Sequence, residues 1–400
     1  MSADKMNSGT DTHESGLNRT QNERVDRKTF LSALGGVAAG ASVFGAAALS
    51  ACKPKGGAGE AAATSGKTYK WKMVTTWPKN FPGLGTGANR LAELLEAMSG
   101  GRIQLKVYAA GELVPAFEVF DAVAKGTADI GHGAAYYWKG KIEAAQFFAA
   151  VPFGLNATEL SGWITYGGGQ ELWDELYAPY NLKPFACGNT GVQMGGWFNR
   201  EIKSMNDFNG LKIRMPGLGG EVLRKAGATV LSLPGGEIFQ ALQSGAIDAT
   251  EWVGPYNDLA FGFYKAAKYY YWPGWHEPGT AMELLINRKL YEELPKDLQT
   301  IVEVACRAAY TEMLAEFSAR NNAALLEMVQ KHKVQLKRFP DDVLRKMGEF
   351  SEEVVAAIAE KDAMSKKIYA SFLKFRGGAV QWDRIGESGY SLARELTVKS

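Results

Sequence analysis

Histidine and cysteine are scarce in this chain of 400 residues, which has four histidines and three cysteines. None of them forms the Cys-x-x-Cys or His-x-x-x-His pairs that are typical of zinc sites and thiol-redox motifs. An excess of charge of one sign is also missing, because 45 basic residues are interspersed with 43 acidic ones. The sequence therefore argues against a zinc enzyme, a thiol oxidoreductase and a nucleic-acid-binding protein.

Composition indicates ordinary globular material, with 46% hydrophobic and 22% charged residues. A chain of this length can form two or three domains, each with a sizeable core.

The N-terminal residues 1–51 are typical of an export signal. A basic stretch, Arg27-Lys28-x-Phe30-Leu31, resembles a twin-arginine signal with lysine in the second position, and a small-residue apolar run follows it. The run ends in Leu49-Ser50-Ala51-Cys52, which resembles a lipobox and predicts lipidation of Cys52. We expect a periplasmic, lipid-anchored protein; cleavage by a peptidase near Ala46–Ala48 is the alternative, and it leaves a free soluble protein.

Residues 52–66 are mostly Gly, Ala, Lys, Ser and Thr and predict a flexible tether. Lipidation of Cys52 leaves Cys187 and Cys306, which we expect to be buried thiols; the sequence leaves their pairing open.

An internal repeat predicts two similar lobes. Glu118–Asp129 aligns without a gap with Glu237–Asp248, and the copies share Glu, Phe, Ala, Gly and Asp at equivalent places. Each copy reads as a short helix, a glycine cap and the start of a strand. The expected fold is α/β with two lobes and a ligand cleft between them.

Arg214 is the strongest candidate for an anion anchor. It lies in Leu211–Met215, an alternating run that Pro216 ends, so a strand is predicted with Arg214 near its carboxyl end. Ligands bind beyond the carboxyl ends of strands in open α/β sheets, and a guanidinium matches a carboxylate. A surface salt bridge is the alternative role.

From Leu290 onward the pattern is helical, with predicted helices from Pro295 to about Lys331 and from Pro340 to about Phe375. Ser351, followed by two glutamates, predicts an N-cap and a fresh helix. These helices pack along both lobes or on a second subunit.

Residues from about Tyr69 to Phe375 resemble the extracytoplasmic solute receptors of tripartite ATP-independent periplasmic (TRAP) transporters. The resemblance is carried by Phe208–Pro216, Gly227–Pro234 and Glu237–Asp248, together with the export signal.

This resemblance implies a two-lobed periplasmic solute-binding protein fold with a long connecting helix and C-terminal helices. The first lobe is then expected over 67–190 plus about 280–320, and the second over 191–279 plus about 321–375. Residues 376–400 are expected to form a C-terminal extension.

Three stretches are similar to the branch of these receptors that binds 2-oxo acids or lactate-like acids with a metal cation. They are Gly191–Trp197, Ala249–Tyr256 and Trp272–Glu277. Trp197, together with the tryptophans of the third stretch, is expected in the core.

The resemblance implies that Arg214 holds the acid, with Tyr137 and Trp252 around it. A carboxylate from Glu251 facing an anionic ligand would be repelled unless a cation lay between them. We therefore expect sodium or calcium bound by Glu251, the Gln193 amide, a backbone carbonyl near Trp252 and the ligand itself. Direct pairing of Glu251 with Arg214 in the absence of ligand is the alternative.

The predicted function is a receptor, not an enzyme, that delivers a small monocarboxylate such as pyruvate to a membrane permease. No organic cofactor is expected, and the C-terminal helices leave a homodimer open. One alternative is a receptor of the same fold for a dicarboxylate or sugar acid. The other is a secreted nicotinamide-dependent oxidoreductase that uses Gly83-Leu-Gly85-Thr-Gly87.

Overall fold

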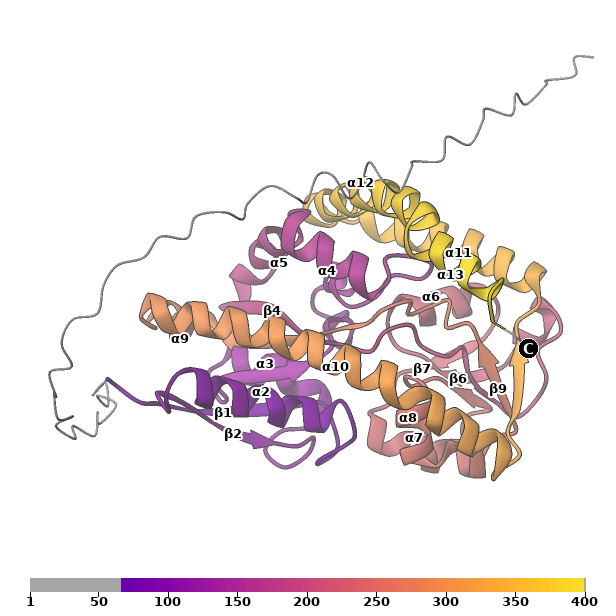
Figure 1. Ribbon diagram of the computed structural model, residues 1–400, viewed down its shortest axis with the longest axis horizontal. Coiled ribbons are helices and arrows are strands. Elements are labelled where there is room, and N and C mark those ends of the chain that lie inside the picture. The colour runs from indigo at the N-terminus through magenta and orange to yellow at the C-terminus, as the bar shows by residue number, and fades with distance from the viewer. Residues whose placement is uncertain (1–65, 399–400) are drawn as a thin grey trace, which may run out of the picture. The chain divides into compact units, whose positions relative to one another are not determined.

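The computed structural model describes residues 66–398, which form two lobes with one β-sheet each (Figure 1). The predicted export signal, Cys52 and the tether up to residue 65 lie outside the described residues. Within 66–398, no helix is both long and apolar enough to cross a membrane.

The first lobe is built on a five-stranded sheet in the order β2-β1-β3-β10-β4. Strands β1, β2 and β3 are parallel, whereas β10 runs antiparallel to β3 and β4. All residues of β10 are buried, as expected of a central strand covered on both faces. The strands are β1 (Tyr69–Thr75), β2 (Ile103–Tyr108), β3 (Ile130–Gly133), β4 (Leu182–Asn189) and β10 (Ala281–Asn287).

One helix of the first lobe, α4, begins at a side-chain cap. The side chain of Asn156 accepts a hydrogen bond from the backbone of Glu159 and forms a capping box that starts α4. The α-helices are α2 (Gly85–Met98), α3 (Val119–Ala124), α4 (Ala157–Tyr166), α5 (Gly169–Tyr177) and α9 (Arg288–Glu292); the short 3-10 helices are η1 (Ala116–Glu118), η2 (Ala135–Trp138), η3 (Glu143–Phe148) and η4 (Ala178–Tyr180).

The second lobe is built on a six-stranded sheet in the order β11-β9-β5-β8-β6-β7. Its strands are β5 (Gly196–Phe198), β6 (Lys212–Arg214), β7 (Thr229–Leu231), β8 (Ala249–Thr250), β9 (Tyr269–Trp272) and β11 (Gln335–Arg338). Its helices are α6 (Gly217–Lys225), α7 (Gly235–Gln243), α8 (Pro255–Phe261), η5 (Met205–Phe208) and η6 (Phe263–Lys265).

The internal repeat occupies equivalent places in the two lobes. The Asp129 carboxylate accepts a hydrogen bond from the Lys72 N–H at 2.8 Å, and the Asp248 carboxylate accepts one from the Lys212 N–H at 2.9 Å. The glycine three residues before each aspartate has a φ of +75° or +76°, a conformation that favours glycine. The predicted helix, glycine cap and strand start are therefore confirmed in both copies.

Two segments, residues 190–195 and 273–280, connect the sheets. They join β4 to β5 and β9 to β10. β4 ends at Asn189 and β10 begins at Ala281, close to the lobe limits predicted near 190 and 280.

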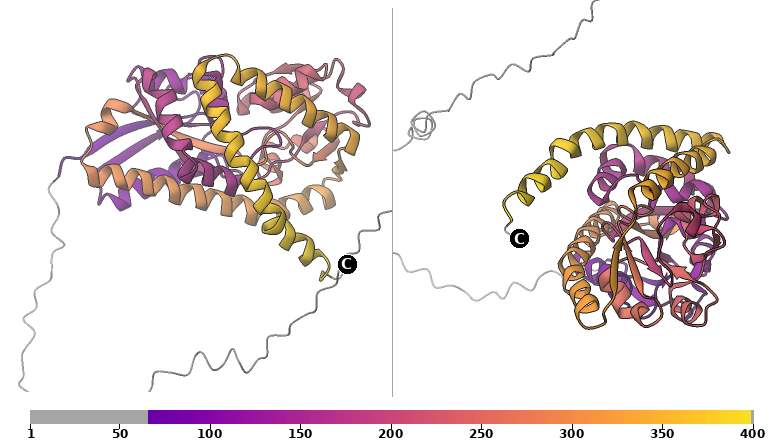
Figure 2. Two further views of the ribbon diagram at one scale, coloured as in Figure 1. Left: turned by 90° about the horizontal axis from the view of Figure 1, so that it is seen from above. Right: turned by 90° about the vertical axis from the view of Figure 1, so that its right-hand side faces the viewer.

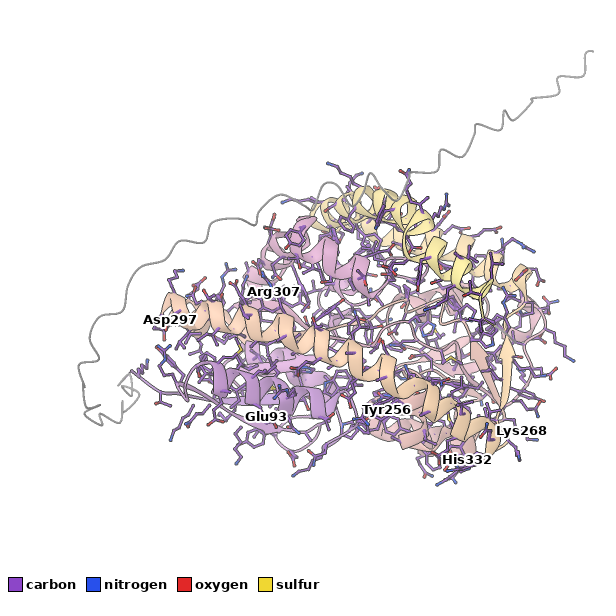
Figure 3. All side chains as sticks on the ribbon, in the orientation of Figure 1. Glu93, Tyr256, Lys268, Asp297, Arg307 and His332 are labelled. Carbon is purple, nitrogen blue, oxygen red and sulfur yellow. The ribbon has the colours of Figure 1, made fainter. Side chains whose placement is uncertain are left out.

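A third connection is α10 (Lys296–Gln330), which lies along both lobes (Figures 1 and 3). Near its start, Asp297 forms an ion pair with Arg102 of the first lobe. Further along, Glu316 accepts a hydrogen bond of 3.0 Å from the Tyr256 hydroxyl of the second lobe. The predicted long helix is therefore continuous.

Two predictions for the C-terminal helices are wrong. Ser351 starts no helix, because α11 (Asp341–Ala359) runs through it and the Ser351 hydroxyl donates to the Met347 carbonyl at 2.6 Å. The apolar spacing of α11 continues on both sides of this serine, and that spacing maintains one helix.

The second wrong prediction assigned residues up to 375 to the second lobe. In α12 (Ala363–Ile385), Phe372 is buried against Trp163 and Phe147 of the first lobe, at ring distances of 5.3 and 5.9 Å. Figure 2 shows α12 crossing over the first lobe, with α13 (Glu387–Glu395) beyond it. Cys187 and Cys306 are free and buried, as predicted.

Candidate functional site

A small cavity between the lobes marks the candidate site. Its volume of about 10 Å³ is close to the minimum for one water molecule. The lining side chains come from both lobes and from the connecting segment between β4 and β5: Trp77, Leu84, Tyr136, Tyr137, Thr190, Gln193, Trp252, Val253 and Met282.

Direct contacts close this cavity. The Asn257 side chain of the second lobe donates to the Pro82 carbonyl of the first lobe at 2.9 Å. Lys139, which follows η2, forms an ion pair of 2.6 Å with Glu221 of α6. The structure therefore represents the closed arrangement of the lobes.

Arg214 lies at the end of β6 with only 1% of its surface exposed. Its Nε donates to the Leu233 carbonyl at 3.2 Å, and its Nη1 donates to a carboxylate oxygen of Glu251. Its Nη2 is buried without a hydrogen-bond partner. Glu251 therefore pairs directly with Arg214, the alternative that the sequence left open, and one arm of the guanidinium remains available.

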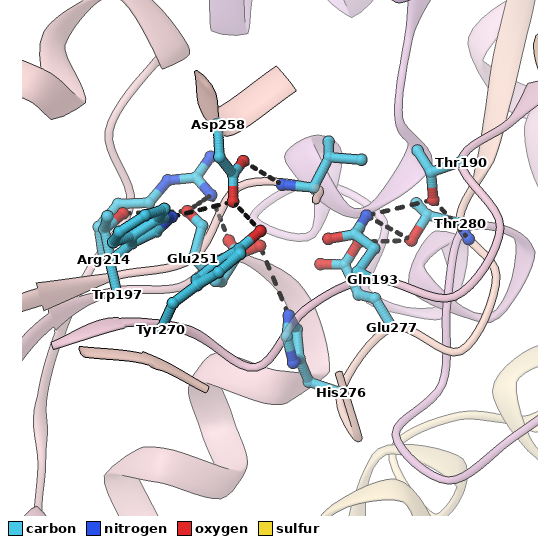
Figure 4. Close-up of polar contacts among 12 residues, drawn as sticks. Thr190, Gln193, Trp197, Arg214, Glu251, Asp258, Tyr270, His276, Glu277 and Thr280 are labelled. Atoms are coloured by element: carbon cyan, nitrogen blue, oxygen red, sulfur yellow. Dashed lines mark hydrogen bonds and ion pairs between the residues drawn. The ribbon is translucent and has the colours of Figure 1, made fainter. Parts of the chain in front are cut away.

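Glu251, His276 and Glu277 form a buried cluster whose ligand atoms lie within 4.8 Å of one another (Figure 4). Burial raises the pKa of Glu251 and of Glu277 to about 7, and it lowers the pKa of His276 to about 4. The histidine is therefore neutral at pH 7. When both glutamates are ionised, Arg214 balances only one of the two negative charges.

Gln193 contacts this cluster through its side-chain nitrogen. Its Nε2 donates to Glu277 at 2.8 Å and to the Thr280 hydroxyl at 3.1 Å. Its Oε1 is buried without a hydrogen-bond partner. Oε2 of Glu251 also lacks a hydrogen bond, and His276 Nε2 lies 3.5 Å from it. Hard cations such as sodium and calcium prefer carboxylate and amide oxygens, so these residues fit such a cation.

Glu277 is the site residue that the sequence analysis missed as a ligand. It lies in the irregular connection between β9 and β10, where no strand pattern indicates the direction of a side chain. The available signal was an acidic residue beside His276 in a segment otherwise rich in Trp, Pro and Gly.

Aromatic side chains, Tyr137 and Trp252 among them, line the cavity. Burial raises the pKa of Tyr137 to about 12, so it keeps its proton. The Trp252 ring lies 5.2 Å from the Arg214 guanidinium and 6.3 Å from Trp77, which the sequence analysis did not identify. Trp77 is oriented by its Nε1, which donates to His132 at 2.8 Å.

The other predicted tryptophans lie elsewhere. Trp197 is buried and donates to Asp258 at 2.9 Å, and Trp275 is buried beside Phe153. Trp272 is 40% exposed, so its prediction as a core residue is wrong.

The glycines at 83, 85 and 87 are packed rather than open. A Cβ at Gly83 would lie 2.7 Å from Phe317, and one at Gly87 would lie 2.5 Å from Met313. The N–H groups of residues 83, 84 and 86–88 already donate to nearby oxygens. This turn therefore lacks the series of free N–H groups that binds the pyrophosphate of a dinucleotide.

Comparison with protein families matches residues 73–362 to the model described as bacterial extracellular solute-binding protein, family 7. A monocarboxylate 2-oxoacid-binding periplasmic protein of Nostoc sp. is 43% identical, over 80% of this chain and 88% of the relative.

Two solved structures are also similar. A TRAP transporter solute-binding protein from Bordetella bronchiseptica, a dimer with calcium and picolinate in one site, has a TM-score of 0.81 and 37% identity, covering 84% of this chain and 100% of that one. A TRAP periplasmic solute-binding protein from Pseudoalteromonas atlantica with sodium and pyruvate has a TM-score of 0.78 and 40% identity. The match covers 81% of this chain and 98% of that one.

The raised pKa of Glu277 predicts how stability depends on pH. Between about pH 5 and pH 7 the folded protein retains a proton that the unfolded chain has lost, so this group lowers the free energy of unfolding as pH rises. Glu277→Gln removes the titrating group and therefore this pH-dependent fall in the free energy of unfolding. In metal-free buffer we expect the variant to gain about 2 kcal/mol relative to the wild type between these pH values.

Urea denaturation at pH 5 and pH 7 measures the difference. The exposed Glu293→Gln is the control for removal of a surface charge. A difference between Glu277→Gln and wild type that does not change with pH would contradict the assignment.

Proposed function

Because the chain belongs to family 7 of the bacterial extracellular solute-binding proteins, which includes TRAP transporter receptors, we propose a specific ligand for it. This ligand is a small monocarboxylate of the 2-oxo acid class, such as pyruvate, bound together with sodium or calcium. The receptor releases the acid unchanged to the membrane subunits of its transporter.

Arg214 is the observation that carries this proposal. Its Nη2 is buried without a hydrogen-bond partner beside Trp252, which lines the cavity, and it offers donors to a carboxylate in a desolvated environment, where such contacts are strong. While Nη1 remains bound to Glu251, Arg214 can hold the acid through one arm only. Release of Glu251 would permit contact through both arms.

Glu251, Glu277, Gln193 and the backbone carbonyl of Trp252 are the proposed cation ligands. The ligand's carboxylate adds a further negative charge to a site where one guanidinium already faces two buried glutamates. A bound cation supplies the missing positive charge. Sodium and calcium beside small acids in the related structures support this assignment.

The proposed size and charge of the acid follow from the walls of the cavity. Aromatic rings of Trp77, Tyr136, Tyr137 and Trp252 enclose it. Arg214 is the only lysine or arginine that is buried among residues 66–398. A dicarboxylate would lack a second buried cationic partner, which favours a monocarboxylate.

Closure of the lobes is proposed to accompany binding. Arg214 belongs to the second lobe, whereas Tyr136 and Tyr137 reach the cavity from η2 of the first lobe. An acid between them contacts both lobes and therefore stabilises the closed state over the open one.

Substitution of Arg214 tests the anchor. We expect Arg214→Ala to weaken pyruvate binding by about 2 to 5 kcal/mol, because a charge-assisted contact is lost and Glu251 loses its partner. Arg214→Lys keeps the charge without the planar guanidinium, so its affinity for pyruvate should lie between those of the wild type and of Arg214→Ala. Calorimetric titration with pyruvate in calcium chloride measures these affinities.

Arg345→Ala, an exposed substitution in α11, is the control and should bind like the wild type. Thermal unfolding shows whether each variant is folded. Unchanged pyruvate affinity in a folded Arg214→Ala protein would remove Arg214 from the site.

A lipid anchor at Cys52 is proposed from the lipobox-like sequence. When the full chain is produced in a bacterium fed labelled palmitate, we expect label in the wild type and its recovery with membranes. Cys52→Ser should lose both properties. Unlabelled wild type would instead favour cleavage near Ala46–Ala48.

A homodimer through the C-terminal helices is also proposed. Trp382, Ile385 and Leu392 are 68%, 77% and 66% exposed, and α13 has no buried residue. Figure 2 shows this end of the chain extending away from the lobes. Such a run of apolar side chains is typical of an interface, and the related Bordetella protein is a dimer.

Ile385→Asp should convert the dimer into a monomer, because a buried charge would lack a partner at the interface. Light scattering after size exclusion measures the mass. Leu113→Asp, which changes an exposed apolar side chain of the first lobe, is the control and should stay dimeric. A monomeric wild type would contradict the proposal.

A further inference from the structure

The residues that fit the cation come from only part of the molecule. Glu277 and Gln193 lie on the two segments that connect the sheets, and Glu251 follows β8 of the second lobe. Within the described chain, the first-lobe sheet and its helices add no acidic or histidine residue to the cluster. The first lobe reaches the cavity with apolar and aromatic side chains instead.

The two connecting segments are hydrogen-bonded to each other as a ribbon. The Thr190 N–H donates to the Thr280 carbonyl at 3.1 Å, and the Gln193 N–H donates to the Glu277 carbonyl at 3.1 Å. A third bond of 3.0 Å joins the Gly274 N–H to the Gln193 carbonyl. These bonds join Gln193 to Glu277 independently of closure.

Bonds to the second lobe attach the ribbon beside Glu251. The Met194 N–H donates to the Val253 carbonyl at 3.0 Å, and the Gly195 N–H donates to the Tyr271 carbonyl at 2.7 Å. These bonds hold Gln193 and Glu277 beside Glu251. The first lobe also attaches to the ribbon, where the Phe153 N–H donates to the Trp275 carbonyl at 2.8 Å, but this bond involves none of the three residues.

Two threonines orient the Gln193 amide. A carboxylate oxygen only accepts hydrogen bonds, so the nitrogen of Gln193 must face Glu277 and its oxygen must point away. The Thr280 hydroxyl donates to the same Glu277 oxygen and accepts from Gln193, and the Thr190 hydroxyl accepts from Gln193 at 3.3 Å (Figure 4). Thr280 therefore holds both side chains in position.

We infer that the cation site is complete in the open receptor, before the acid binds and the lobes close, and that Thr280 is its positioning residue. This inference rests on the proposed function. The cation then converts a repulsive cluster into one that accepts a carboxylate, and the aromatic side chains of the first lobe discriminate the acid.

The test titrates ion alone into protein freed of metal and acid. The ion is whichever of calcium chloride and sodium chloride supports pyruvate binding, and calorimetry measures its affinity. We expect ion binding without pyruvate. Thr280→Val should weaken it by about 10- to 100-fold, as loss of a residue supporting metal ligands does, whereas Thr280→Ser should restore it.

Tyr137→Ala is the matched variant in the first lobe. It should lose affinity for pyruvate and bind the ion like the wild type. Small-angle X-ray scattering gives a second readout. The radius of gyration should stay constant when the ion is added and fall when pyruvate follows.

Ion binding that requires pyruvate would overturn the inference, as would wild-type ion affinity in Thr280→Val. Failure of the proposed function gives a different result, because wild-type protein would then bind no pyruvate with either ion.

Discussion

The buried ion pair between Arg214 and Glu251 governs the chemistry of this molecule. Its two partners lie at the ends of neighbouring strands, β6 and β8, and both are excluded from water. Glu277 adds a second carboxylate to the same cluster. His276 does not balance its negative charge, because burial lowers the pKa of His276 and keeps the imidazole neutral. A site with this surplus of buried negative charge is costly on its own, and a cation with an anionic ligand relieves that cost.

The scaffold explains why these groups meet. Asp129 and Asp248 each tie the start of a strand to a parallel neighbour, so both lobes deliver the residues after that strand to the cavity. Behind the aromatic wall, buried Glu283 accepts hydrogen bonds from Trp138 and Tyr177 and thereby supports η2. The aromatic wall of the first lobe and the charged cluster are therefore held by separate polar contacts.

Sequence reasoning predicted most of this arrangement where a residue follows regular structure. Arg214 and Glu251 follow strands whose periodicity and repeat are readable, so their meeting could be anticipated. Glu277 and Trp77 lie in irregular connections, where side-chain direction depends on tertiary contacts that no local pattern encodes. The predicted helix start at Ser351 was wrong for a related reason, because the local capping preference of this serine was overridden by a continuous apolar face on α11. The wider resemblance supplied the ligand class, which composition alone could not.

Mass spectrometry after denaturation of the mature receptor, purified from a bacterial host without added ligand, tests the central claim most directly. Elemental analysis of the same sample measures the metal. The account predicts an intact 2-oxo acid and about one equivalent of sodium or calcium. A nucleotide cofactor, or a dicarboxylate without a metal, would contradict it.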